Sequence, residues 1–134
     1  MKKHGFTLIE LLAVIVILGV IALIATPLAM NTIEESRKSS FQISVQHMVS
    51  AIRTDQANQD YIAVYYTFPL SANSTLKLDG DTSEWVGSAE IDEEGKIAFA
   101  VFNGKYCAYK TKNDFDFQVV TGKSQSECLA FYQS

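Results

Sequence analysis

The stretch FTLIELLAVIVILGVIALIATPLAM, residues 6–30, decides the architecture of this 134-residue chain. Its only polar side chains are Thr7, Glu10 and Thr26. About 20 apolar residues suffice for a helix that crosses the hydrocarbon core of a bilayer, because each adds about 1.5 Å. The stretch therefore predicts a membrane-spanning helix, and the more polar sequence from Asn31 onward predicts a water-soluble part.

A removable secretory signal is the first alternative for this stretch. Such a signal has an apolar region of about 7–15 residues that ends in small residues before the cut. The present run has about 25 residues, and Pro27 spoils such a site near its end. A spanning helix fits better. Because Lys2 and Lys3 precede the run, the positive-inside rule places the N-terminus in the cytoplasm and the bulk of the protein outside.

Glu10 is the unusual residue of the spanning segment. An acid at mid-bilayer costs about 2.5–3.5 kcal/mol on an insertion scale, although the start of a helix favours a negative group. An acid in such a place calls for a partner. If the chain is cut between Gly5 and Phe6, the new amine supplies a positive charge four residues away, about one helical turn.

These residues resemble a known signature. Gly5-Phe6-Thr7-Leu8-Ile9-Glu10, followed by an unbroken apolar run, is similar to the prepilin motif of type IV pilins, type II secretion pseudopilins and competence pilins. The resemblance covers about residues 2–27. It implies that a membrane prepilin peptidase cuts after Gly5 and methylates the amine of Phe6. It also implies that Glu10 meets the N-terminal amine of a neighbouring subunit. The ordinary alternative is an anchor in which Gly5 and Glu10 are incidental.

Gly19 and Pro27 are candidate points of helix flexibility. Proline has no N–H and crowds the carbonyl of Leu23, and glycine weakens a helix. The resemblance implies that this stretch loses helical order during assembly. The alternative is a static kink, in which neighbouring groups bond the backbone carbonyls that the proline leaves free.

The rest of the chain predicts an α+β head. We expect a leader at residues 1–5, a transmembrane and assembly helix at 6–30, and an amphipathic helix with a globular head at 31–134. The helix is expected to run from about residue 6 to residue 59 and to pack one apolar stripe on the head. The members of this stripe are Ile33, Phe41, Val45, Met48 and Ile52.

The second half of the chain predicts a small antiparallel sheet. Residues 61–66 are either a strand or an apolar cover over the helix. Strands are expected at 85–92, 97–102 and 105–111, with a tight turn at Asn103-Gly104. Alternation from Phe115 to Val120 predicts one more strand. A helix laid across such a sheet is a pilin-like α+β arrangement.

Cys107 and Cys128 are candidates for a disulfide, because the expected topology places both on the oxidising side of the membrane. Such a bond also resembles the C-terminal disulfide loop of many pilins. The alternative is two buried thiols.

The sequence gives little basis for catalysis or cofactor binding. His47 is the one histidine left after cleavage, no nucleophile and base can be paired, and no cluster of Cys or His predicts zinc. We therefore expect no enzyme activity and no cofactor. Asp79, Asp81 and Glu84 are candidate calcium ligands, with a plain solvated turn as the alternative.

The expected function is that of a structural pilin in a type IV pilus or a similar filament, serving adhesion, motility or related surface functions. The expected partners are sister subunits, the prepilin peptidase, membrane proteins of the assembly machinery, and the membrane itself before assembly. The chain carries 15 acidic and 11 basic residues. Loss of Lys2 and Lys3 moves its net charge from −4 to −6. This argues against nucleic-acid binding unless the chain is a competence pilin.

Two alternatives remain at this stage. The first is a minor pilin or pseudopilin of a secretion or DNA-uptake system. The second is a membrane-anchored binding domain that is never cut. As a pilin, minor pilin or pseudopilin, the subunit starts in the inner or cytoplasmic membrane and ends in a periplasmic or extracellular filament.

Overall fold

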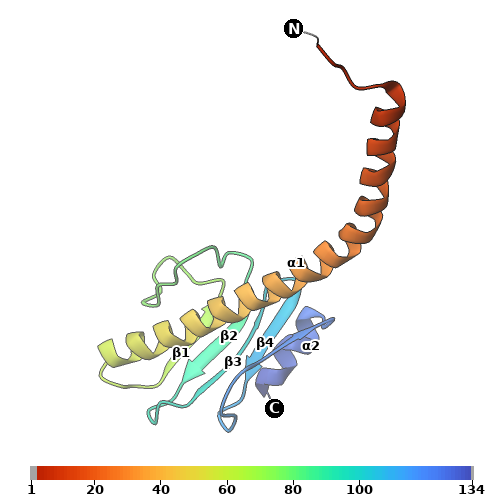
Figure 1. The fold of residues 1–134 in the computed structure, drawn as a ribbon. Helices are drawn as coiled ribbons and strands as arrows, with labels where there is room; N and C mark the ends of the chain where they lie inside the picture. Colours follow the sequence, from red (N-terminus) through yellow and green to blue (C-terminus); the bar gives the residue numbers. More distant parts are fainter. Residues whose placement is uncertain (1–2, 134) are drawn as a thin grey trace. The chain divides into compact units, whose positions relative to one another are not determined.

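The computed structural model describes residues 3–133, and they form one long helix, a five-stranded sheet and a short C-terminal helix (Figure 1). The elements are α1 (Leu8–Asn58), β1 (Val64–Phe68), β2 (Val86–Ile91), β3 (Ile97–Phe102), β4 (Tyr106–Lys110), β5 (Gln118–Thr121), α2 (Gln125–Ala130) and the 3-10 helix η1 (Phe131–Gln133). The chain divides into two compact units, Met1–Arg37 and Lys38–Ser134. We call the second unit the head.

The first unit consists of the N-terminal part of α1 and the residues before it. The predicted helix limits, about 6 and 59, agree with the observed Leu8 and Asn58. Large apolar side chains from Phe6 to Met30 are at least half exposed. Among the described residues, α1 is the one helix that is long and apolar enough to cross a membrane.

The sheet of the head is antiparallel throughout, with strand order β1-β2-β3-β4-β5. The predicted Asn103-Gly104 turn joins β3 to β4. Asn103 Oδ1 accepts hydrogen bonds from the backbone N–H groups of Lys105 and Tyr106, and Gly104 has φ +95°. This positive φ suits glycine, which has no Cβ. β1 and β5 are the two edge strands.

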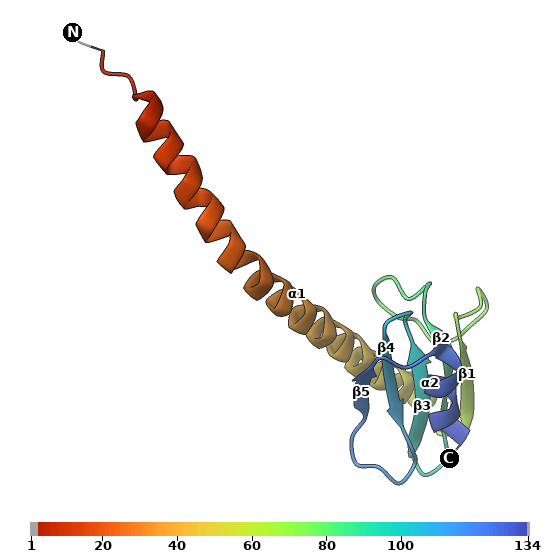
Figure 2. The same cartoon turned by 90° about the vertical axis from the view of Figure 1, so that its right-hand side faces the viewer.

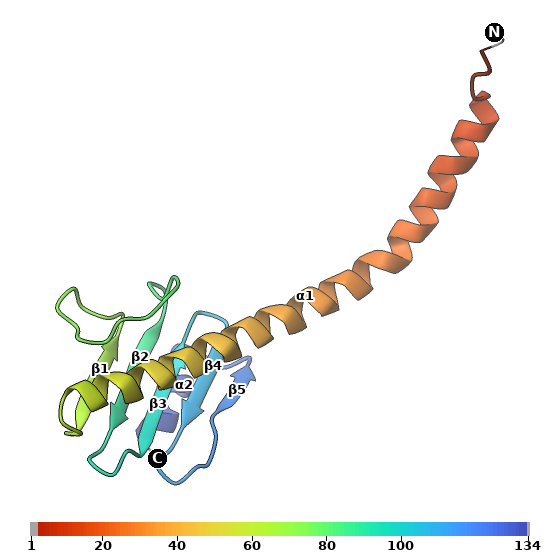
Figure 3. The same cartoon turned by 60° about the vertical axis from the view of Figure 1, so that its left-hand side comes forward.

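The C-terminal part of α1 covers one face of this sheet (Figures 1 and 3). Its stripe of Phe41, Val45, Met48 and Ile52 is at most 5% exposed, which confirms four of the five predicted positions. Ile33 is 50% exposed and lies in the first unit, so the prediction for this residue was wrong. The sheet side of the core consists of Tyr66, Phe68, Ala89, Ile91, Ile97, Phe99, Val101, Tyr106 and Ala108, with Leu76 and Trp85 beside them.

α2 covers the opposite face of the sheet (Figure 2). Ala98 and Ala100 of β3 alternate with the core residues of that strand, so their side chains point away from α1. Both are buried, at 5% and 0% exposure. Their small side chains let α2 approach β3 closely. The central strand is therefore buried on both faces.

Two predictions about the second half of the chain needed correction. The last strand begins at Gln118 rather than Phe115, because a turn closed by Thr111 and Asp114 and a bend after it occupy the preceding residues. The sequence predicted no helix around Cys128, whereas this segment is helix α2. Residues 61–66 were expected to be either a strand or an apolar cover over the helix. The structure shows a strand, which starts at Val64 and pairs with β2.

Candidate functional site

The candidate assembly segment begins with a reciprocal cap at the start of α1. The Thr7 N–H donates to Glu10 Oε2 at 3.1 Å, and the Glu10 N–H donates to Thr7 Oγ1 at 3.3 Å. The first intrahelical bond runs from the Leu11 N–H to the Thr7 carbonyl at 3.1 Å. This capping box satisfies backbone donors that a helix start otherwise leaves open. Glu10 therefore has a local partner in the uncut chain.

The sequence analysis missed the role of Thr7. The signal was present, because Thr7-Leu8-Ile9-Glu10 has the Thr-x-x-Glu spacing that marks a capping box before an apolar run. Glu10 was singled out only for its charge. In the structure the same carboxylate also fixes the first residue of the helix.

Gly5 and Phe6 lie in irregular backbone immediately before the helix. The Phe6 side chain is 90% exposed. A Cβ added at Gly5 would have no heavy atom within 4 Å, so the fold itself does not require glycine there. A requirement for glycine at this position would come from a processing enzyme. Met1 and Lys2 of the predicted leader lie outside the described residues.

Gly19 and Pro27 both lie inside α1, which is helical through both positions. Thr26, the residue before the proline, donates a hydrogen bond from its Oγ1 to the Ala22 carbonyl at 2.7 Å. A Cβ at Gly19 would meet nothing within 4 Å. The flexibility expected at these two residues remains a prediction.

Cys107 and Cys128 form the predicted disulfide, with Cα atoms 5.7 Å apart. Both are fully buried. Cys107 lies in β4 and Cys128 in α2, so the bond fastens α2 to the sheet face that α1 does not cover. Ring stacking adds to this attachment, because the centroids of Phe131 and Tyr109 are 4.0 Å apart.

The three candidate calcium ligands lie in the exposed connection before β2. Asp81 Oδ1 accepts hydrogen bonds from the N–H and the hydroxyl of Ser83, at 3.0 and 2.6 Å. These bonds lower the pKa of Asp81. Within residues 3–133 no three His, Cys, Asp or Glu side chains gather as a metal-binding group, and Asp79, Asp81 and Glu84 do not do so either.

A buried polar network joins the end of α1 to the sheet. Asp55, which is 9% exposed, accepts three hydrogen bonds at Oδ2. The donors are the Tyr66 hydroxyl at 2.6 Å, the Gln59 amide at 2.8 Å and the Thr75 hydroxyl at 2.8 Å. Gln56 Nε2 donates to the carbonyls of Ile62 and Asp92. The network was not predicted from the sequence, because its partners are distant in the chain.

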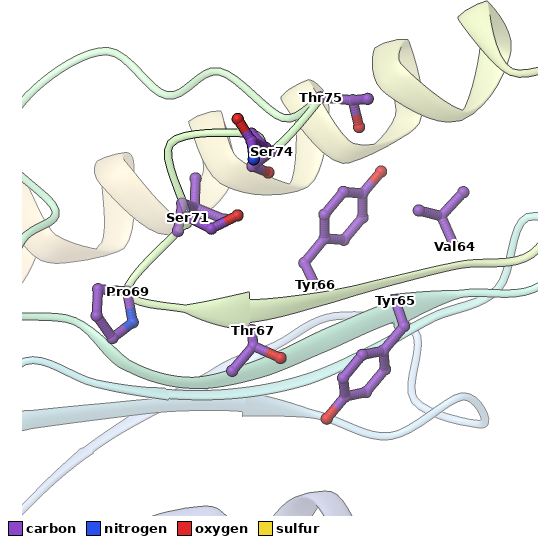
Figure 4. Close-up of a pocket in the computed structure, with 10 residues that line it drawn as sticks. Val64, Tyr65, Tyr66, Thr67, Pro69, Ser71, Ser74 and Thr75 are labelled. Carbon is purple, nitrogen blue, oxygen red and sulfur yellow. The ribbon is translucent and has the colours of Figure 1, made fainter.

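A hollow of about 370 Å³ lies beside the edge strand β1 (Figure 4). One wall is the strand itself, and the other is the chain that returns after it. Its lining holds no charged side chain and consists of Val64, Tyr65, Tyr66, Thr67, Pro69, Leu70, Ser71, Asn73, Ser74 and Thr75.

Comparison with known families supports the reading of the N-terminus. Residues 1–26 match the family model described as the prokaryotic N-terminal methylation motif. This is the prepilin motif of type IV pilins and pseudopilins, so the N-terminal part of the chain is similar to that of pilin-like proteins. The search of curated proteins and the search of solved structures each gave no significant match.

Proposed function

We propose that this chain is a structural pilin, cut after Gly5 and polymerised through its N-terminal helix into a type IV pilus or a similar filament. The observation that carries the proposal is the match of residues 1–26 to the methylation motif, which in general implies processing by a prepilin peptidase and assembly into pilus-like filaments. The exposed apolar helix behind the motif is consistent with a membrane anchor.

The chemistry of the N-terminus supports an assembly role for Glu10. Cleavage after Gly5 creates an amine on Phe6, whose unperturbed pKa is about 7.7–8.0, so it is largely protonated at neutral pH. In the filament core an unpaired carboxylate is costly, so subunits are favoured in the register that brings Glu10 to a neighbour's amine. Until that amine is in place, the Glu10 carboxylate accepts a hydrogen bond from the Thr7 N–H.

The proposal places the subunit first in the inner or cytoplasmic membrane, with its N-terminus in the cytoplasm. Membrane proteins of an assembly machinery then extract it into a filament outside that membrane. Apolar residues of the segment 6–30, exposed in the single chain, are buried against sister subunits there. The heads coat the filament.

The first test is the N-terminal mass and sequence of the protein from cells with an active prepilin peptidase. We expect a chain that starts at Phe6 and is heavier by one methyl group. Gly5→Val is the matched variant: because the fold leaves space at Gly5, it should stay folded and remain uncut. A wild-type chain that still starts at Met1 would contradict the proposal and indicate an unprocessed membrane-anchored domain.

A second measurement separates a major pilin from a minor pilin or pseudopilin. If the chain is the main subunit, it should dominate the protein content of sheared, purified filaments. A trace amount in filaments built from another subunit would assign it a priming role. Glu10→Gln, cut normally, should lower the filament yield in either case.

A further inference from the structure

The peptide bond that a prepilin peptidase would cut lies immediately outside α1. Residues 3–7 have irregular backbone, and the helix begins at Leu8. Phe6 is 90% exposed, and a Cβ added at Gly5 would have no heavy atom within 4 Å. Hydrolysis adds water across the Gly5–Phe6 bond and leaves a carboxylate on Gly5 and an amine on Phe6. The enzyme must therefore reach the Gly5 carbonyl, and an exposed, irregular segment allows this.

A helix that began one turn earlier would enclose this bond. In an α-helix each backbone N–H donates to the carbonyl four residues before it. Growth by one turn would therefore bond the Ile9 N–H to the Gly5 carbonyl oxygen. The same growth would need the N–H groups of Thr7 and Glu10 as donors to carbonyls further upstream. The Gly5 carbonyl would then be part of the helix and closed to an enzyme.

The capping box holds the two N–H groups that this growth requires. The Thr7 N–H donates to Glu10 Oε2, and the Glu10 N–H donates to Thr7 Oγ1. These side-chain oxygens take the places that the carbonyls of Lys3 and Phe6 would have in a longer helix. Open N–H groups are costly beside a membrane-spanning segment. Without the box, the upstream carbonyls become the nearest available partners.

We propose that Thr7 is a positioning residue for processing, which together with Glu10 fixes the start of α1 so that the Gly5–Phe6 bond stays outside the helix. The match of residues 1–26 to the methylation motif is the separate observation that points to an enzyme acting here. This inference rests on the proposed function. It gives Glu10 a second role, which requires an oxygen acceptor but no charge.

Cleavage of the detergent-solubilised full chain by purified prepilin peptidase tests the role of the box. Thr7→Val keeps the branched shape but removes the hydroxyl oxygen, and Glu10→Ala removes the other acceptor. Each should lower kcat/KM severalfold, because the capped helix start loses its advantage over a longer helix.

The matched controls keep the acceptor or move the substitution. Thr7→Ser and Glu10→Gln retain an oxygen that can accept the same hydrogen bond, so both should be cut at nearly the wild-type rate. Thr26→Val makes the same chemical change at another threonine of α1 that forms a side-chain hydrogen bond, and it should also be cut normally. Fluorescence of the buried Trp85 checks that the head of every variant is folded.

Backbone chemical shifts of the same samples show whether the helix start has moved. Gly5 and Phe6 should give non-helical Cα shifts in the wild type and in the three controls. In Thr7→Val and Glu10→Ala these shifts should become helical, and the Ile9 amide should exchange more slowly. Non-helical shifts at Gly5 and Phe6 in both slowly cut variants would overturn the inference.

A double-mutant cycle separates positioning from direct recognition by the enzyme. If both residues act through one box, Thr7→Val combined with Glu10→Ala should be cut no more slowly than the slower single variant. Additive losses, or a loss from Thr7→Val alone, would mean that the enzyme contacts the threonine itself and would overturn the inference. Glu10→Gln as slow as Glu10→Ala would overturn it as well. These results leave the pilin function standing, whereas a wild-type chain that is never cut would contradict both.

Discussion

At the residue scale, the Asp55 network is the most demanding feature of the head. A buried carboxylate needs partners, and Asp55 finds three donors from three different segments. Tyr66 brings β1 to the helix, and Thr75 brings the chain that walls the hollow. The network therefore holds the end of α1, the edge strand and the wall of the hollow together.

We expect Asp55→Asn to destabilise the head by about 1.5–3 kcal/mol, because it removes a charged acceptor of several hydrogen bonds. Tyr66→Phe should cost about 1 kcal/mol. The double variant should lose less than the sum of the two, since both single changes break the same bond. Urea unfolding followed by the fluorescence of Trp85, 5% exposed beside Phe41 and Phe68, measures this.

The control for this cycle is Asp79→Asn. Asp79 is exposed, so its replacement should change the free energy of unfolding by no more than about 0.5 kcal/mol. Strict additivity of Asp55→Asn and Tyr66→Phe would contradict the proposed coupling.

The same tyrosine predicts a pH dependence. Burial, followed by the hydrogen bond to Asp55 and its negative charge, raises the pKa of Tyr66 above the ordinary value of 10.0. As the pH rises past that value, the unfolded chain loses the proton first, so the head becomes less stable. Tyr66→Phe should flatten this loss. Urea midpoints from about pH 8 to pH 11 test it. Equal slopes for both proteins would contradict the assignment.

Gly87 is the glycine that the sheet requires. Its φ is +146°, and an added Cβ would lie 2.0 Å from the Ala100 carbonyl oxygen on β3. Gly87→Ala should therefore force β2 and β3 apart and destabilise the head by about 3 kcal/mol or more. Gly95→Ala is the control, because Gly95 also has a positive φ but open space around it. It should cost about 1 kcal/mol from backbone strain alone. Equal losses would contradict the steric argument.

At the scale of elements, α1 combines two kinds of helix in one. Up to Met30 its side chains are apolar on every side, which suits lipid or sister helices. From Phe41 a single apolar stripe is buried and the remaining faces are mostly polar, with Ile43 as an exposed exception. The change in pattern along one continuous helix separates the segment proposed to polymerise from the part that supports the sheet.

Pro27→Ala tests whether the proline loosens α1. The substitution restores an N–H that can bond the Leu23 carbonyl. We expect slower hydrogen exchange of the amides around residues 24–28 in the detergent-solubilised full chain, with little change at residues 41–52. Gly19→Ala should also stabilise the helix, by about 1 kcal/mol. Unchanged exchange near Pro27 would indicate a static feature.

At the scale of the whole head, the sheet lies between two helices that contribute unequally to its core. α1 contributes the main core, whereas α2 is six residues long and depends on its attachments. These are the disulfide, the Phe131–Tyr109 stack, and a hydrogen bond between Tyr132 and Glu90. The hydrogen bond of Glu90 with Lys112 and, to a smaller extent, the one with Tyr132 lower the pKa of Glu90. Ser124 and Glu127 add a capping box at the start of α2.

Replacing both Cys107 and Cys128 by Ala should lower the stability of the head by about 3 kcal/mol in the chain-entropy model. α2 should also detach before the core unfolds. Trypsin cleavage after the exposed Lys123 reports this detachment, and Trp85 fluorescence reports the core. Simultaneous loss of both signals would show that α2 and the core form one cooperative unit. Ser126→Ala is a control, since Ser126 is exposed on α2.

The sequence by itself determined much of this protein. Hydrophobic length identified the spanning helix, 3.6-residue periodicity found the stripe from Phe41 to Ile52, and Asn103-Gly104 located a hairpin. The motif around Gly5 and Glu10 makes the N-terminus similar to that of pilin-like proteins. These features are local, so the residues that cause them are neighbours in the chain.

Only the tertiary structure decided the features that join distant residues. It showed a Cys107–Cys128 disulfide instead of two free thiols, showed helix α2 around Cys128, and placed the start of the last strand at Gln118 instead of Phe115. It also showed the Asp55 network and left Phe115 exposed across the sheet from an uncharged hollow. Sequence patterns record which side chains are apolar, but burial, pairing and exposure depend on which distant segments meet.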